Sequence, residues 1–168
     1  MSEQTTRPGE GRSAERPDAV GFEIVRVFDA PRELVWQLWT TEADAEDWWH
    51  PRGIEIKPGS VRVDARPGGE YAYTMVNPAD GSEYPTAGVY REVSPFSRLV
   101  FTWGGPDDDD ADRPLITVDL DDLGDGRTGM RFRVDGVAAG PGDDMYDGWA
   151  SAHDVLAERL ADAQAGAA

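Results

Sequence analysis

Residues 115–134 read LITVDLDDLGDGRTGMRFRV, and this stretch decides the fold. Two runs with high β-propensity, Leu115–Leu120 and Gly129–Val134, flank a short turn rich in Asp and Gly. So short a turn joins antiparallel neighbours, because parallel strands need a crossover of about a dozen residues or more. We therefore predict an antiparallel hairpin at this point of the chain.

The same two-residue period continues toward the N-terminus. In residues 71–76 the tyrosines and a methionine alternate with smaller side chains, and a turn of the type Asn-Pro-Ala-Asp-Gly follows. The other segments with strand character are Phe22–Phe28, Ile54–Ile56, Val61–Val63, Gly88–Val93 and Arg98–Trp103. Together they predict a curved antiparallel sheet of about six or seven strands.

Helical signals lie on either side of this sheet region. Pro31 with Glu33 begins an amphipathic helix, and Glu42–Trp49 predicts a second short helix. Near the C-terminus, one helix face carries the apolar residues Met145, Trp149, Ala152, Leu156 and Leu160. The element order indicates an α+β fold in which this long last helix covers the apolar face of the sheet.

The composition of the chain indicates where the folded domain begins and ends and which kinds of partner are disfavoured. We expect a disordered tail over residues 1–20, one domain over residues 21–162 and a frayed end over residues 163–168. The 16 Lys and Arg against 33 Asp and Glu give a net charge of −17, which disfavours nucleic acid and anionic membranes as partners. No apolar run is long enough to span a membrane, and cysteine is absent, so we expect a cytoplasmic protein, monomeric or homodimeric.

Several motifs, spread in order from Phe22 to Leu160, are similar to those of one family. They are Asp29-Ala30-Pro31, Val35-Trp36, Trp39-Thr40, Trp48-Trp49-His50-Pro51, Arg66-Pro67-Gly68-Gly69-Glu70, Gly88-Val89-Tyr90, Arg98-Leu99-Val100-Phe101-Thr102 and Gly148-Trp149. The chain thereby resembles the Aha1-like (activator of Hsp90 ATPase homologue) family of the START/Bet v 1-like superfamily. The resemblance implies a helix-grip fold, with a cavity between the sheet and the C-terminal helix.

The resemblance leaves the function open, because this superfamily contains lipid carriers, polyketide cyclases, co-chaperone domains and proteins similar to enediyne self-resistance proteins. Both histidines stand at departures from the family pattern. The family commonly has glycine at the position of His50 and leucine at the position of His153. We interpret His50 as a solvated loop residue and His153, one turn after Trp149, as a polar group that faces the cavity.

The candidate site consists of aromatic side chains and one histidine. A pocket lined by aromatic rings with a few hydroxyl and N–H groups suits a planar, mostly apolar ligand. The proposed ligand-binding residues are Trp39, Trp49, Tyr71, Tyr73, Tyr90, Trp103, Trp149 and His153. No metal-ligand spacing, cofactor motif or serine nucleophile motif is present, so we expect no metal, no cofactor and no catalytic residue. The acidic run Asp107–Asp112 is interpreted as a solvated, mobile loop.

Three functions follow from these observations. The first is non-enzymatic binding or sequestration of a hydrophobic, aromatic small molecule, with antibiotic self-resistance as one setting. The second is a co-chaperone that activates Hsp90, although we expect the chain to lack room for the additional N-terminal domain that such activators carry. The third is an acid–base enzyme of the cyclase or dehydratase kind, which would depend on His153.

Overall fold

The computed structural model describes residues 21–167, so the expected tail at residues 1–20 lies outside the described part. One antiparallel sheet of eight strands dominates this part, in the order β2-β9-β8-β7-β6-β5-β3, with β4 paired to β5. The strands are β2 (Gly21–Phe28), β3 (Glu55–Ile56), β4 (Arg62–Val63), β5 (Glu70–Val76), β6 (Glu83–Ser94), β7 (Arg98–Thr102), β8 (Leu115–Gly124) and β9 (Arg127–Asp135). The helices are α2 (Arg32–Thr40), α3 (Glu42–Trp48) and α4 (Asp144–Ala167), with a 3₁₀ turn, η2 (Asp110–Asp112).

The predicted hairpin forms as expected. Strands β8 and β9 pair with Leu120 opposite Met130, and in both strands buried, mostly apolar residues alternate with more exposed ones. The turn places Gly124, Asp125 and Gly126 in the left-handed region, with φ of 84°, 56° and 74°. Glycine adopts this conformation without strain and Asp tolerates it, which is why this composition makes the turn.

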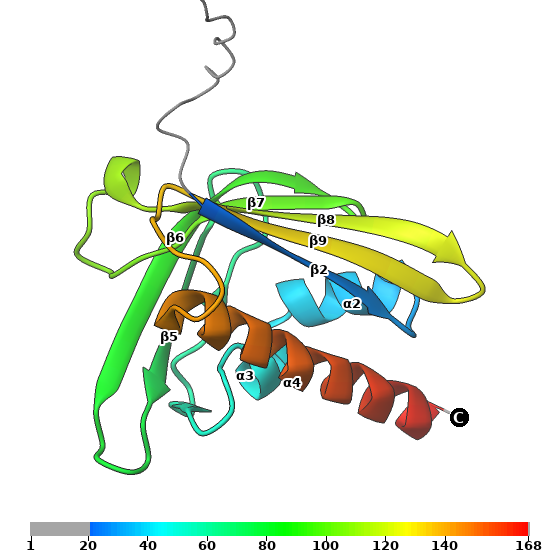
Figure 1. The fold of residues 1–168 in the computed structure, drawn as a ribbon, viewed down its shortest axis with the longest axis horizontal. Helices are drawn as coiled ribbons and strands as arrows, with labels where there is room; N and C mark the ends of the chain where they lie inside the picture. The colour runs from blue at the N-terminus through cyan, green and yellow to red at the C-terminus, as the bar shows by residue number, and fades with distance from the viewer. Residues whose placement is uncertain (1–20, 168) are drawn as a thin grey trace, which may run out of the picture.

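The sheet is strongly curved, and the bend occurs along β6. The pairing of β6 with β7 shifts register between Tyr90 and Glu92, an irregularity of the kind that bends a strand. The β5–β6 hairpin therefore leaves the plane of the other strands, and α4 runs across the concave side with α2 and α3 (Figure 1). The α+β helix-grip prediction is confirmed.

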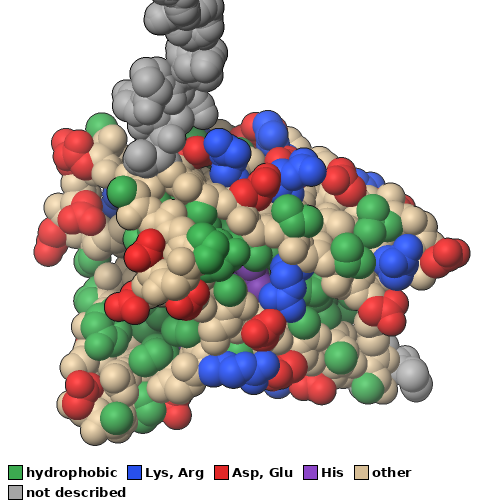
Figure 2. Space-filling view, viewed as in Figure 1, with side chains coloured by type: hydrophobic (Ala, Val, Ile, Leu, Met, Phe, Trp, Pro, Cys, Tyr) green, Lys and Arg blue, Asp and Glu red, His purple; other side chains and the backbone are tan. Residues whose placement is uncertain are grey.

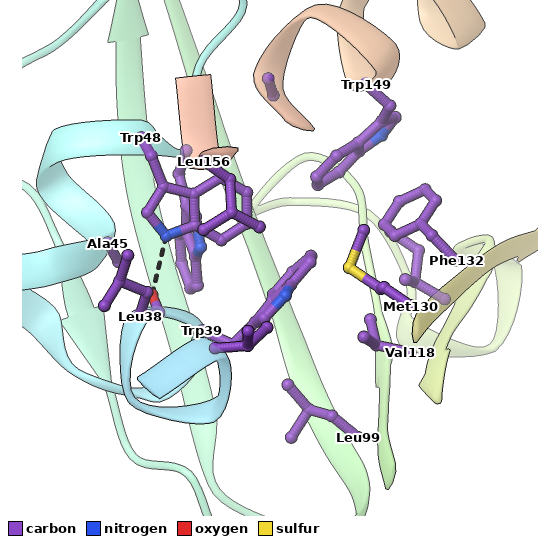
Figure 3. Close-up of a cluster of buried hydrophobic side chains, with 14 of the residues drawn as sticks. Leu38, Trp39, Ala45, Trp48, Leu99, Val118, Met130, Phe132, Trp149 and Leu156 are labelled. Atoms are coloured by element: carbon purple, nitrogen blue, oxygen red, sulfur yellow. Dashed lines mark hydrogen bonds between the residues drawn. The ribbon is translucent and has the colours of Figure 1, made fainter. Parts of the chain in front are cut away.

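The core lies between α2, α4 and the concave face of the sheet. At its centre, the Trp39 ring lies 4.5 Å from that of Trp48, 6.1 Å from that of Phe132 and 6.5 Å from that of Trp149. Figure 3 shows Trp39 facing the buried side chains of β8 and β9. It also shows the hydrogen bond of 2.7 Å that the Trp48 indole donates to the Leu38 carbonyl. This hydrogen bond fixes α3 on the end of α2.

Helix α4 continues to Ala167, past residue 162, where we expected the ordered domain to end. Gln164 donates a hydrogen bond to the Asp29 carbonyl at 2.6 Å, which ties the last turns of α4 to the start of α2. Arg26 of β2 pairs with Asp154 of α4 at 2.9 Å. Within residues 21–167, no helix is long and apolar enough to cross a membrane.

Candidate ligand pocket

A pocket of about 170 Å³ opens between β5, the end of α3 and the first turns of α4. Its walls are almost entirely aromatic or aliphatic, apart from one histidine and one carboxylate. They consist of Trp49, His50, Pro51, Tyr73, Met75, Trp103, Asp144, Met145, Gly148, Trp149 and Ala152. In the space-filling view, hydrophobic side chains gather over β5 and β6 beside the start of α4, below acidic side chains of the preceding loop (Figure 2).

The helical wall of the pocket follows from the spacing of residues in α4. Met145, Trp149 and Ala152 recur at intervals of four and three residues, so they share one face of the helix. Gly148 lies beside them, and a Cβ added there would meet no heavy atom within 4 Å. The absence of a side chain at Gly148 therefore leaves part of the pocket empty.

The loop after α3 supplies the opposite wall. His50 is half-buried there, and its Nδ1 lies 3.0 Å from the Pro51 carbonyl, to which it donates as Nδ1–H. The amide of Arg52 donates to Ser151 Oγ of α4 at 2.9 Å, and the Arg52 guanidinium pairs with Glu158. These contacts hold the loop against α4, so His50 is a wall residue and not the solvated loop residue that we predicted.

Behind the pocket lies a second void of about 10 Å³. Four of its lining rings also line the outer pocket, and they form the partition between the two spaces. The partition residues are Trp49, Tyr73, Trp103 and Trp149, and the remaining lining residues of the void are Trp39, Tyr71 and Phe101. We call this second space the inner void.

Two phenols in this region are hydrogen-bonded and held neutral. Tyr71 donates to the Thr102 carbonyl at 2.6 Å, and the Trp103 indole donates to the Tyr73 hydroxyl at 3.0 Å. Burial raises the pKa of Tyr73 to about 12 and that of Tyr71 well above its usual value. Neither tyrosine can act as a base near neutral pH, so these side chains are suited to packing and orientation.

The structure brings six of the eight proposed site residues together. Trp49, Tyr73, Trp103 and Trp149 line the outer pocket, while Trp39 and Tyr71 join them around the inner void. Tyr90 lines neither space. It is buried against Tyr71 and Phe101, and burial raises the pKa of its hydroxyl.

His153 also lines neither space, contrary to our expectation that it faces the cavity. It is fully buried, with its ring 4.6 Å from that of Phe132, and neither ring nitrogen has a hydrogen-bond partner within residues 21–167. Burial, aided by the positive charge of Arg26, lowers the pKa of His153 to about 3. The spacing from Trp149 correctly predicted an inward position, but His153 points toward the core beneath β9.

Sequence reasoning missed the aliphatic part of the wall. Met145 and Ala152 were read as one apolar face of the last helix and Met75 as one face of a strand, but none was assigned to a site. Gly148 belongs to a family-like motif and could have been noticed as a gap in an otherwise apolar stripe. For His50, one feature of the sequence could have indicated a role in the site: the family commonly has glycine at this position.

The acidic run Asp107–Asp112 is exposed to solvent as predicted, apart from the half-buried Asp110, and side-chain contacts anchor it. Asp110 accepts hydrogen bonds from the Thr102 hydroxyl and from Arg113 at 3.0 Å, and it pairs with Arg91. Asp108 accepts from the Gly105 amide at 2.8 Å. Asp110 therefore joins the loop to β6 and β7, while the Asp108 contact lies within the loop. Within residues 21–167, no cluster of His, Cys, Asp and Glu has the arrangement of a metal site.

Comparison with known proteins agrees with this architecture. The family model described as activator of Hsp90 ATPase homolog 1-like protein matches residues 29–161, most of the chain. The chain belongs to this family. Membership in the activator of Hsp90 ATPase homolog 1-like family confirms the resemblance found in the motifs from Asp29 to Trp149. No curated protein matches the chain.

Solved structures of several proteins superpose on the chain. Protein CV1439 from Chromobacterium violaceum is 26% identical, with a TM-score of 0.72 over 83% of this chain and 96% of that one. The AHSA1 protein from Silicibacter pomeroyi is 25% identical, with a TM-score of 0.67 over 84% and 98%. An Hsp90 activator from Plasmodium falciparum, PFC0360w, is 19% identical, with a TM-score of 0.54 over 76% and 79%, and shares the fold.

Proposed function

We propose that the chain is a cytoplasmic, non-enzymatic binding protein that holds a small, apolar aromatic molecule in the pocket between β5 and α4. The observation that carries this proposal is the pocket wall, in which rings from β5, α4 and the ends of α3 and β7 surround an open space of about 170 Å³. A cavity of about 150 Å³ lined by apolar side chains is large enough for benzene. The pocket therefore encloses about one ring, and its open mouth lets a larger molecule extend outward.

The charges near the pocket favour a neutral ligand. Asp144 stands in the wall, and the chain carries a net charge of −17, so an anionic ligand would be repelled. A charged group would also lose its hydration on entering an apolar wall, which costs much more than burial of a neutral group.

Gly148 allows the pocket to be blocked without damage to the fold. We expect Gly148→Leu to raise the stability of α4 by about 1 kcal/mol, because glycine is a poor helix former. Its side chain would occupy the outer pocket and weaken binding of N-phenyl-1-naphthylamine, a neutral fluorescent probe, at least tenfold. Probe fluorescence gives the affinity, and thermal unfolding gives the stability.

Gly140 provides the matched control for this experiment. A Cβ there also meets nothing within 4 Å, but Gly140 lies outside the pocket wall. Gly140→Leu should leave the probe affinity unchanged. Equal affinities for the native chain and the Gly148→Leu variant, or no binding to either, would contradict the proposed site.

Activation of Hsp90 is the second candidate function. It is favoured by the family's name and by the shared fold with the Plasmodium falciparum activator. We expect the chain to leave the rate of ATP hydrolysis by purified Hsp90 unchanged when added in excess. An acceleration of several fold, retained in Gly148→Leu, would favour the co-chaperone function over the pocket.

An acid–base enzyme has less support. That function depended on His153 as a polar group in the cavity, and His153 lies outside the pocket wall. Its pKa of about 3 keeps it neutral at physiological pH, and its buried ring has no access to a ligand in the pocket.

A further inference from the structure

The first turn of α4 carries carboxylates to the edge of the outer pocket. Asp144 belongs to the pocket wall and lies one helical turn before Gly148, so the two residues share one face of α4. Asp143 and Asp147 flank Asp144, and all three side chains belong to residues exposed to solvent. In the described part of the chain, no lysine or arginine is among the residues that line this pocket.

The two flanking carboxylates are held in place by the loop before α4. Asp143 accepts a hydrogen bond from the Gly140 amide at 2.7 Å, and Asp147 accepts one from the Gly142 amide at 3.3 Å. The N-terminus of a helix is equivalent to roughly half a positive charge, which three carboxylates exceed. The start of α4 is therefore negative on balance.

The basic side chains next to the segments of the wall are each paired with a carboxylate. They are Arg52 with Glu158, Lys57 with Glu83, and Arg113 with Asp110. The partner of Arg52 lies about four turns further along α4 than Asp144, so this guanidinium is directed away from the first turn. These cations therefore leave the negative charge at the mouth of the pocket uncompensated.

A ligand can satisfy both the apolar wall and the acidic mouth if its charge stays outside the wall. The pocket encloses about one ring, and a group attached to that ring by a short alkyl link would lie at the open mouth. A positive charge there remains hydrated, so it avoids the cost of entering the apolar wall. In water, two opposite unit charges about 4 Å apart attract by an energy equivalent to about fivefold in affinity.

We propose that the pocket is selective for arylalkylamines, whose neutral aromatic ring fills the outer pocket while the protonated amine lies at the mouth, attracted by Asp144 and its neighbouring carboxylates. This inference rests on the proposed function, since it assigns a ligand class to the same pocket. The part of the ligand inside the wall stays neutral, and the charge is added only outside it.

Three naphthalene probes test the charge preference. 1-Naphthylmethylamine, 1-naphthalenemethanol and 1-naphthoate share one ring system and carry a positive, a neutral and a negative group. Displacement of N-phenyl-1-naphthylamine from the full chain gives the affinity of each. At low ionic strength the amine should bind about fivefold more tightly than the alcohol, and the carboxylate more weakly than both. In 1 M NaCl, where the screening length is about 3 Å, the advantage of the amine should nearly vanish.

Two variants that each remove one negative charge locate the preference. Asp144→Asn should bring the affinities for the amine and the alcohol within about twofold of each other. Asp125→Asn is the matched control, because Asp125 lies in the β8–β9 turn, at the opposite end of the molecule from the start of α4 (Figure 1). Asparagine tolerates the φ of 56° at that position, and the advantage of the amine should equal that of the native chain. The salt dependence of the native chain decides the question if Asp144→Asn does not fold.

Three results would contradict the inference, and they are distinguishable. If the three probes bind equally and Gly148→Leu weakens all of them, the pocket binds aromatic rings regardless of charge, and the proposed function stands. If Asp144→Asn and Asp125→Asn reduce the advantage of the amine equally, the preference arises from the net charge of −17 and not from the mouth of the pocket. If no probe binds to the native chain, the inference and the proposed function both fail.

Discussion

Acidification from pH 8 to pH 4.5 should destabilise the native chain by about 3 kcal/mol more than its His153→Leu variant. The reason is the fully buried imidazole of His153, which lies against Phe132 and near Arg26. Burial lowers its pKa from 6.5 to about 3, so the folded protein keeps the ring neutral where the unfolded chain takes up a proton.

The sign of the effect follows from proton linkage. Above pH 6.5 the ring is neutral in both states, and His153 causes no pH dependence. Between pH 6.5 and about 3 only the unfolded chain is protonated, so each unit of falling pH removes about 1.4 kcal/mol from the free energy of unfolding. The loss reaches about 5 kcal/mol near pH 3 and does not grow further below it.

Urea unfolding of both proteins at pH 8 and pH 4.5 measures this difference. The subtraction removes the contribution of the many carboxylates, which titrate in both proteins. At pH 8 the His153→Leu variant should already be more stable by about 1–3 kcal/mol, because two unpaired ring nitrogens are replaced by an apolar side chain. Its affinity for the pocket probe should not change, because His153 is not part of the wall.

Equal losses of stability in the two proteins would show that His153 is protonated in the folded state, with a partner for its charge. A large loss of probe affinity would restore His153 to the binding site and contradict its placement beneath β9.

The fold could be predicted because local signals and global architecture agree. The alternation in residues 115–134, the short turn between them and the apolar stripe from Met145 to Leu160 each specify an element without long-range information. The curvature of the sheet could not be derived in this way. It depends on a register shift at Tyr90, which is a property of two paired strands and leaves no pattern in either one.

The site was harder to predict, since a pocket is space left over after packing. Periodicity placed Trp149 and His153 on inward-facing parts of α4, but one lines the pocket and the other lies in the core. Phe132 of β9 contacts both rings, at 4.7 and 4.6 Å, and the pocket opens only beside Trp149, one turn nearer the start of α4. Gly148 could not be assigned to the site for a similar reason. A missing side chain leaves a pocket only where the surrounding residues are packed around it, and the sequence alone does not show that packing.

In the family-like motif Gly88-Val89-Tyr90, close packing of three strands requires glycine at position 88. It stands in β6 opposite Tyr71 of β5, and the Tyr71 ring passes over it to donate a hydrogen bond to the Thr102 carbonyl of β7. A Cβ at residue 88 would lie 1.8 Å from that carbonyl oxygen and 2.6 Å from Cε1 of Tyr71. Both distances are far below van der Waals contact, and the first involves backbone, which no side-chain rotation can relieve.

Gly88→Ala should therefore lower the free energy of unfolding by about 3 kcal/mol, the upper range for an overpacked core. The added methyl group would separate β6 from β7 and break the buried Tyr71–Thr102 hydrogen bond. Gly129→Ala is the matched control, because Gly129 also lies in a strand and its Cβ would come no closer than 3.4 Å to any atom, all of the nearest ones being in the Leu123 side chain. We expect it to cost less than about 1 kcal/mol.

Urea unfolding followed by tryptophan fluorescence gives both free energies. If Gly88→Ala does not fold at all while Gly129→Ala does, the contrast still supports the close approach of three strands at Gly88. Equal and small losses in the two variants would mean that β6 and β7 can separate at Thr102 without cost. The partition around the inner void would then be looser than described, because Tyr71 lines that void and depends on Gly88 for its position.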